Sequence, residues 1–203
     1  MTETAVAISI VSHGHASLVS QLLHDLRECP EATQIIVTVN VPDADIILPP
    51  SLRDRITLVH NSAPLGFGAN HNAAFELCDA PYFCILNPDI RLLANPFPVL
   101  QAGLEDVALA APLILNPKGG TEDSARRFPT PLALMLRVAG LTVGTYHVDR
   151  SQPLLLPDWV AGMFMLFKTS TYAALGGFDD RYYLYCEDID ICARLRRDGY
   201  EIG

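Results

Sequence analysis

The chain has 203 residues, half of them hydrophobic, and a formal net charge of −9. This length fits one domain with a substantial core and leaves no room for a second full domain. The acidic balance argues against a sequence-independent nucleic-acid binder, because such a protein needs a basic stripe to neutralise phosphates. We therefore expect no nucleic-acid partner and only local recognition of phosphate.

The N-terminal residues carry no basic region, and no apolar run reaches the length of a membrane span. The five cysteines are scattered and form no Cys-x-x-Cys pair, which disfavours a disulfide framework and a zinc site. These features predict a cytoplasmic protein with reduced thiols. A location at the inner face of the membrane is left open.

The first half of the chain shows alternating strand and helix patterns. Continuous apolar or β-branched runs predict strands, and apolar residues at intervals of three and four predict helices. In chain order we expect a strand at 5–11, a helix at 18–26, strands at 34–39 and 56–59, a helix at 69–78 and a strand at 82–86. This alternation predicts an α/β fold with a doubly wound, mostly parallel sheet flanked by helices.

The second half contains longer loops. We expect a strand at 107–115, a loop at 116–130, a helix at 132–143, a strand at 159–167 and a short helix at 170–175. The helix at 132–143 is a candidate for peripheral contact with the membrane if the substrate is lipid-linked, with an ordinary core helix as the alternative. The last four residues resemble the opening of another strand, so we expect either a domain truncated at its C-terminal end or a short member of its class.

Polar residues follow the predicted strands where those strands end. In doubly wound sheets ligands bind at the carboxyl ends of the strands. The residues at these ends are Ser12, His13, Asn40, Asn61, Asn87 and Asp89. Asp89, with Asn87 beside it, suits a hard cation such as Mn²⁺ or Mg²⁺ that also binds substrate phosphates. The alternative is an Asx turn without a metal.

A loop with two glycines, Gly66 and Gly68, lies between a predicted strand and a predicted helix. Glycines permit a tight turn and let backbone N–H groups approach a phosphate. The loop lacks the third glycine of a dinucleotide-binding fingerprint and the lysine of a phosphate loop, so neither of those motifs fits. The alternative is a simple glycine turn with Asn70 as the helix cap.

Arginines and histidines are both expected near the carboxyl ends of the predicted strands, where a ligand would bind. The adjacent Arg126 and Arg127 are suited to clamp a diphosphate or an anionic acceptor, or they form a solvated loop pair. Three of the six histidines, His13, His15 and His71, fall near this edge without metal-ligand spacing. We expect most of the histidines to be surface or loop residues.

Three carboxylates, Glu187, Asp188 and Asp190, lie between a tyrosine-rich run at 182–185 and a basic stretch at 194–197. Adjacent helical residues point about 100° apart, so Glu187 and Asp188 are expected to have unequal roles. Crowding by like charges predicts a raised pKa for Asp188, which suits a general base. The alternative is an acidic helix N-terminus that compensates the peptide dipole.

Five motifs, in this order, resemble those of the family 2 glycosyltransferases of the GT-A fold, especially bacterial rhamnosyltransferases. The motifs are Asn-Ser-Ala-Pro-Leu-Gly-Phe-Gly-Ala-Asn-His-Asn at 61–72, Leu-Asn-Pro-Asp at 86–89, Trp-Val-Ala-Gly-Met at 159–163, Gly-Gly-Phe-Asp at 176–179 and Tyr-Cys-Glu-Asp-Ile-Asp at 185–190. The resemblance covers nearly the whole chain. It implies one catalytic domain over 1–203, with a nucleotide-sugar-binding part at 1–115 and an acceptor and catalytic part at 116–203.

The resemblance also implies an activity and a set of site residues. The expected enzyme is an inverting, metal-dependent transferase that moves a sugar, expected to be rhamnose, from a nucleotide-diphosphate donor to a saccharide or lipid-linked acceptor. Asp188 would be the general base with Glu187 as its partner, and Asp89 would bind the metal. The donor would contact Ser12, Asn40, Gly66, Gly68, Asn70 and Asn87, and the acceptor would contact Trp159, Gly162, Met163, Arg126 and Arg127.

The chain departs from the family pattern at two places. Asn40 stands in the run Thr-Val-Asn-Val, where the family usually carries an Asp-Asn pair that holds the nucleobase, and the family continues past the position of Gly203. The missing continuation, together with Asn87 in place of the first Asp of the family's Asp-x-Asp metal motif, leaves open a non-catalytic nucleotide-sugar-binding module. A nucleotidyltransferase is disfavoured, because residues 12–15 do not form a Gly-rich basic loop after the first strand.

Overall fold

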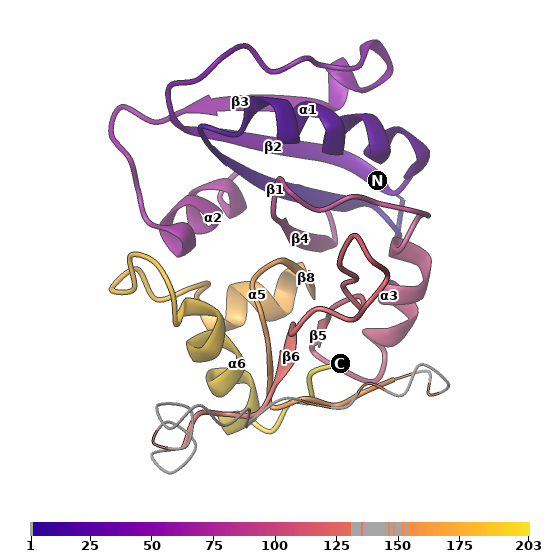
Figure 1. The fold of residues 1–203 in the computed structure, drawn as a ribbon, viewed down its shortest axis with the longest axis vertical. Coiled ribbons are helices and arrows are strands. Elements are labelled where there is room, and N and C mark those ends of the chain that lie inside the picture. Colours follow the sequence, from indigo (N-terminus) through magenta and orange to yellow (C-terminus); the bar gives the residue numbers. More distant parts are fainter. Residues whose placement is uncertain (1, 131–134, 136–145, 147, 149–151, 153) are drawn as a thin grey trace.

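In a computed structural model the chain forms three layers, with helices on both faces of one sheet (Figure 1). The structure describes residues 2–130, 135, 146, 148, 152 and 154–203. The sheet has the strand order β3-β2-β1-β4-β8-β5. Its strands are β1 (Val6–His13), β2 (Ala32–Val41), β3 (Ile56–His60), β4 (Tyr82–Leu86), β5 (Leu109–Ala110) and β8 (Phe164–Lys168). The first four strands pair in parallel, and β8 is antiparallel to both β4 and β5, which confirms the predicted fold class.

The helices divide between the two faces of the sheet. They are α1 (Ala16–Asp25), α2 (Phe67–Phe75), α3 (Phe97–Gly103), α5 (Thr169–Leu175) and α6 (Glu187–Arg197), with the 3-10 helices η1 (Leu26–Glu28) and η2 (Pro50–Arg55). Val6, Ile8 and Ile10 of β1 pack in a core with residues of α1 and α3. Ala7 packs in a second core, with residues of α2, α5 and α6. The near-continuous apolar run of β1 is therefore explained by burial on both faces.

Two expected strands are shorter than predicted. The strand expected at 107–115 is limited to β5, because Pro112 has no N–H for a ladder and the N–H of Ala111 donates to Gly203 instead. The strand expected at 159–167 is broken at Gly162 into β7 (Trp159–Val160) and β8. The short β7 pairs with β6 (Ala125–Arg126), which lies within the expected loop at 116–130.

The C-terminal residues pair with the β5 edge of the sheet. Ile202 forms a parallel bridge with Leu109 at the β5 edge, consistent with the expected opening of a strand. The expected helix at 132–143 lies outside the described residues, so its contact with a membrane stays a prediction. Within the part that the structure describes, no helix is both long and apolar enough to cross a bilayer.

Candidate active site

A cavity of about 360 Å³ lies where the strand order reverses, between the carboxyl ends of β1 and β4. This is the position at which doubly wound sheets bind ligands. The cavity is lined by Val11, His13, His15, Leu18, Asn40, Leu65, Gly66, Phe67, Asn70, Asn87, Pro88, Asp89, Tyr183 and Leu184. The structure thus brings five predicted donor or metal residues together and adds His13, His15, Tyr183 and Leu184.

An asparagine network shapes the wall of this cavity. Asn40 accepts hydrogen bonds at Oδ1 from the N–H of Leu65 (2.8 Å) and from Nδ2 of Asn61 (2.8 Å), and its own Nδ2 donates to the carbonyl of Leu65 (3.0 Å). Asn61 Nδ2 also donates to Oδ1 of Asn70 (2.7 Å), and Asn70 Nδ2 donates to the carbonyl of Gly66 (2.9 Å). Because these amides already bond within the protein, Asn40 and Asn70 mainly fix the loop at 61–66.

The glycines of this loop are required by close packing. A Cβ on Gly66 would lie 2.5 Å from the carbonyl oxygen of Tyr183, and a Cβ on Gly68 would lie 2.7 Å from Cβ of Phe178. Both glycines therefore let α2 approach a segment that is more than 100 residues away in the sequence. Ser12 does not line the cavity, because its buried hydroxyl accepts a hydrogen bond from the N–H of His15 (3.2 Å).

The candidate metal ligands, Asn87 and Asp89, line the same cavity. Asp89 is exposed at the cavity, and Asn87 precedes it by two residues. The N–H of Asn87 donates to the carbonyl of Met163 (2.9 Å), which ties the donor side to an expected acceptor residue. Within the described residues no group of three or more His, Cys, Asp or Glu side chains is placed to hold a metal. One carboxylate and one amide oxygen still fit a hard cation that takes its other ligands from substrate phosphates and water.

Asp188 belongs to α6, and its carboxylate contacts Gly162 in the break between β7 and β8. The N–H of Gly162 donates to its Oδ2 (3.2 Å), and the N–H of Ile189 donates to its Oδ1 (2.8 Å). Burial raises the pKa of Asp188 above its ordinary value, while these hydrogen bonds and the positive charge of Arg126 lower it. The predicted direction of the pKa shift is confirmed, but its main cause is burial rather than crowding by like charges.

Glu187 has a different environment from Asp188. It is only 5% exposed and lies on the buried stripe of α6 with Ile191 and Leu195, spaced four residues apart. Its Oε2 atom has no hydrogen-bond partner among the described residues. Burial raises the pKa of Glu187, and the neighbouring charge of Asp188 adds to this effect. The side chains of Glu187 and Asp188 therefore lie in different environments, although the residues are adjacent in the sequence.

The arginine pair is supported by aromatic rings. The guanidinium of Arg126 lies 5.2 Å from the ring centroid of Trp159, and that of Arg127 lies 4.8 Å from the ring centroid of Tyr146. Trp159 is buried, and its Nε1 donates to the carbonyl of Arg127 (3.0 Å). Trp159 thus holds the arginines in place, whereas Arg126 itself is also paired with Asp123 (3.0 Å).

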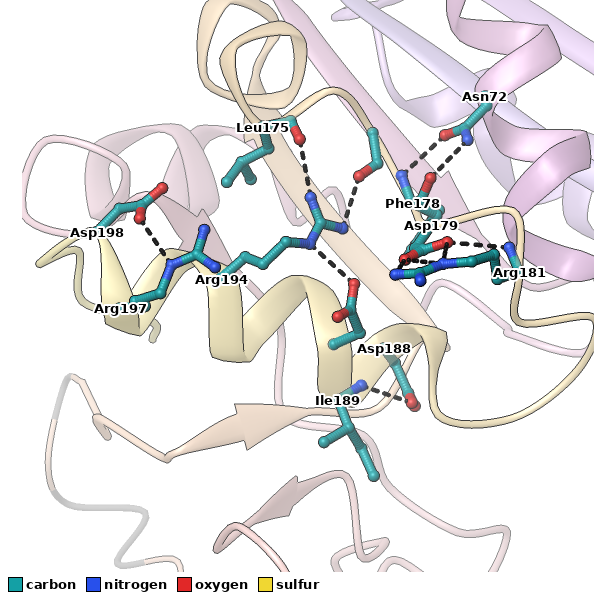
Figure 2. A network of polar contacts seen from close by, with 12 residues as sticks. Asn72, Leu175, Phe178, Asp179, Arg181, Asp188, Ile189, Arg194, Arg197 and Asp198 are labelled. Atoms are coloured by element: carbon teal, nitrogen blue, oxygen red, sulfur yellow. Dashed lines mark hydrogen bonds and ion pairs between the residues drawn. The ribbon is translucent and has the colours of Figure 1, made fainter.

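A polar network holds α6 and its carboxylates in position (Figure 2). Arg194 donates from Nε to Oδ2 of Asp190 (2.8 Å), from Nη1 to the carbonyl of Leu175 (2.8 Å) and from Nη2 to the carbonyl of Gly177 (2.7 Å). Asn72 of α2 bonds both the N–H and the carbonyl of Phe178 (2.9 Å each). The Gly-Gly-Phe-Asp motif therefore joins α2 to α6.

His71 is an exception to the expected surface location of the histidines. It is 1% exposed, its Nδ1 is hydrogen-bonded to Oγ of Ser9 (2.8 Å), and its ring lies 4.5 Å from that of Phe67. Burial lowers its pKa to about 3, so the ring is neutral. It faces the sheet with Ala74 and packs as part of the support of the site.

Known bacterial rhamnosyltransferases are similar to this chain. Over 210 residues the chain is 30% identical to rhamnosyltransferase WbbL of Escherichia coli K12, which covers 97% of this chain and 79% of that protein. The chain belongs to the rhamnosyltransferase-like family 2 glycosyltransferases. It is also 34% identical over 97 residues to the N-acetylglucosaminyl-diphospho-decaprenol L-rhamnosyltransferase of Mycobacterium tuberculosis, a match that covers 44% of this chain and 32% of that protein. No protein-family profile matches the chain.

Solved structures of glycosyltransferases share the fold of this family member. A mannosyltransferase from Pyrobaculum calidifontis, in complex with GDP-Man and Mn²⁺, aligns with a TM-score of 0.61 and 16% identity, covering 97% of this chain and 53% of that chain. GalNAc-T7 with UDP, GalNAc and Mn²⁺ aligns with a TM-score of 0.70 and 13% identity, covering 98% of this chain and 41% of that chain. The chain thus spans about half the length of these structures or less, and the likeness shows the GT-A fold.

Proposed function

We propose that this glycosyltransferase moves a rhamnosyl group from a nucleoside-diphosphate donor to a hydroxyl of a lipid-linked saccharide. The observation that carries this proposal is the similarity to a rhamnosyltransferase over nearly the whole chain. The name of the mycobacterial relative supports a lipid-linked acceptor. The cavity at the strand-order reversal, with a half-buried Asp188 on the adjacent element, supplies a site for this chemistry.

The proposed reaction is a direct displacement. The acceptor oxygen forms a bond to the anomeric carbon, and the bond from that carbon to the diphosphate oxygen breaks, so the anomeric configuration inverts. Asp188 accepts the proton of the attacking hydroxyl, and the nucleoside diphosphate leaves with the bonding electron pair. The hydrogen bonds from Gly162 and Ile189 hold the carboxylate of Asp188 in position. Burial of this carboxylate raises its pKa toward that of a useful base.

The candidate site residues divide into donor and acceptor roles in this proposal. Asp89 and Asn87 would hold Mn²⁺ or Mg²⁺, which when bound would neutralise the charge of the diphosphate. Arg126 and Arg127 would bind the anionic part of the acceptor. The alternative is a module that binds a nucleotide sugar without catalysis, and the similarity to an enzyme over 97% of the chain disfavours it.

Transfer of labelled rhamnose tests the function, and calorimetry tests the metal. The wild type should transfer label from a nucleoside-diphosphate rhamnose to an N-acetylglucosaminyl diphosphate lipid, whereas a binding module would not. Nucleoside diphosphate should bind more tightly with Mn²⁺ than with a chelator, and Asp89→Ala should remove this difference. Asp106→Ala, at an exposed position after α3, is the matched control. Equal affinity with Mn²⁺ and with the chelator would refute the metal assignment.

A further inference from the structure

An exposed aromatic segment precedes the helix that carries the carboxylates. Tyr182, Tyr183, Leu184 and Tyr185 are 36%, 62%, 53% and 76% exposed. We call residues 182–185 the tyrosine segment. Single exposed apolar residues are ordinary on protein surfaces, but four in succession beside a ligand cavity indicate a binding surface.

The backbone of the tyrosine segment is fixed on α2. The N–H of Phe67 donates to the carbonyl of Tyr183 (2.9 Å), and Gly66 leaves room for this contact. Tyr185 and Cys186 then adopt φ angles of 69° and 71°, in the left-handed region that non-glycine residues rarely occupy. Such strain is kept where the surrounding structure imposes it, and it often occurs at functional sites. The side chains of the segment are therefore presented from a fixed backbone.

The tyrosine segment is linked to the candidate base through Phe67 and Gly162. Tyr183 and Leu184 line the cavity at the carboxyl ends of the strands. The ring of Phe67 lies against Gly162, where an added Cβ would be 3.2 Å from that ring, and the N–H of Gly162 donates to Asp188. A ligand that extends from the cavity toward Asp188 therefore lies beside the tyrosine segment. In the proposed reaction the acceptor hydroxyl meets the donor sugar at this place.

The charge around the tyrosine segment indicates a neutral ligand group. Carboxylates flank it on both sides, with Asp179 and Asp180 before it and the α6 carboxylates after it, and the nearby Arg181 is paired with Asp179. This acidic setting opposes an anionic lipid surface, which is attracted by clusters of Lys and Arg. A tyrosine ring combines an apolar face with a hydroxyl at its edge. It therefore suits a sugar ring, whose C–H face stacks on the aromatic face while its hydroxyls form hydrogen bonds.

We propose that Tyr183, with Leu184 beside it, forms the platform on which the sugar ring of the acceptor stacks. This inference rests on the proposed function and names residues that select the acceptor. The two side chains lie outside the acceptor residues expected from the family motifs. They recognise the sugar itself rather than the diphosphate or the lipid chain.

Steady-state kinetics with two acceptors test this inference. One acceptor is N-acetylglucosaminyl diphosphate on a long polyprenyl chain, and the other carries the same head group on a short water-soluble alkyl chain. Tyr183→Ala should raise the KM for both acceptors about tenfold, which corresponds to about 1.4 kcal/mol. The kcat and the calorimetric affinity for the nucleoside diphosphate should stay within about twofold of the wild type, since in this inference the Tyr183 ring contacts the acceptor sugar and not the diphosphate or the base. Tyr183→Phe keeps the stacking face and should retain most of the wild-type affinity for the acceptor.

The matched control is Tyr200→Ala, which removes a half-exposed tyrosine beyond the other end of α6 and should change neither KM. An unchanged acceptor KM in Tyr183→Ala would overturn the inference. An increase confined to the long-chain acceptor would assign the segment to the lipid, and a loss of donor affinity alone would assign it to the donor. Absence of transfer by the wild type with either acceptor would refute the proposed function itself, so the two failures are distinguishable.

Discussion

The pKa of Asp188 is subject to opposing effects from its surroundings. Burial raises the pKa of its carboxyl group, whereas two backbone N–H groups and the charge of Arg126 lower it. Burial is the largest of these effects, so the pKa lies above the ordinary value of 3.8. A base with a raised pKa holds a transferred proton more firmly.

Removing the charge of Arg126 should therefore change the pH profile. Arg126→Gln should raise the pKa of Asp188 further, because the positive charge no longer stabilises the carboxylate. The acid limb of kcat against pH should then move to higher pH. Arg197→Gln, which removes an exposed arginine at the far end of α6, should leave the limb in place. A limb that stays fixed in Arg126→Gln, or moves to lower pH, would contradict the assigned electrostatics.

His71 links the stability of the fold to pH. Burial lowers its pKa to about 3, compared with 6.5 for an ordinary histidine. Between these values the unfolded chain binds a proton that the folded chain does not, so the free energy of unfolding falls as the pH falls below about 6.5. For this one group the slope reaches about 1.4 kcal/mol per pH unit. The raised pKa values of Glu187 and Asp188 act in the opposite direction.

Urea denaturation at a series of pH values measures this linkage. His71→Gln should lose stability at neutral pH, since a buried contact with Ser9 is altered, but its stability should depend less on pH between about 6.5 and 4.5 than that of the wild type. His24→Gln, at an exposed position, should keep the wild-type slope. An equal slope in His71→Gln and the wild type would show that His71 is not held neutral by burial.

At the scale of elements, Arg194 fixes α6 against the turn that follows α5. Its side chain is 19% exposed, and it satisfies two carbonyls and one carboxylate. Arg194→Met should lower the free energy of unfolding by about 2–4 kcal/mol, because it leaves these groups partly buried without a partner. Arg197→Met removes an arginine that is 72% exposed and should cost no more than about 0.5 kcal/mol. Equal losses in chemical denaturation would contradict the structural role of Arg194.

The elements with long apolar runs were predictable from the sequence. The strand expected at 5–11 corresponds to β1 and the strand expected at 82–86 to β4, because burial on both faces leaves a nearly continuous apolar pattern. The break at Gly162 was not predictable, since the residues on both sides of it are apolar. The partner of β7 is β6, more than 30 residues earlier, and such a distant pairing leaves no local pattern.

At the scale of the molecule, the positions of the site residues were more predictable than their contacts. Asn40, Asn87 and Asp89 reach one cavity because parallel strands end at the same edge of a sheet. The approach of a phosphate to Gly66 stays a prediction, and the structure adds that the missing side chain of Gly66 makes room for Tyr183. This contact joins segments more than 100 residues apart, so only the folded structure reveals it.

The two parts of the chain meet at the cavity. Residues before 115 supply most of its lining and the candidate metal ligands, while the later residues supply Tyr183, Leu184 and, beside them, Asp188. Two backbone hydrogen bonds join these parts, one from Asn87 to Met163 and one from Phe67 to Tyr183. The proposed division into a donor part and an acceptor part is compatible with this arrangement.

The central proposal is that Asp188 takes the proton of the acceptor during rhamnosyl transfer. Its most direct test is the turnover of labelled donor by the wild type, Asp188→Asn and Glu187→Gln, with donor affinity measured by calorimetry on the same proteins. Asp188→Asn should lower kcat by about a hundred- to ten-thousand-fold and leave donor affinity largely intact, while Glu187→Gln should lose less activity. Near-wild-type turnover by Asp188→Asn would contradict the proposal, and loss of turnover in Glu187→Gln instead would reverse the assignment of the base.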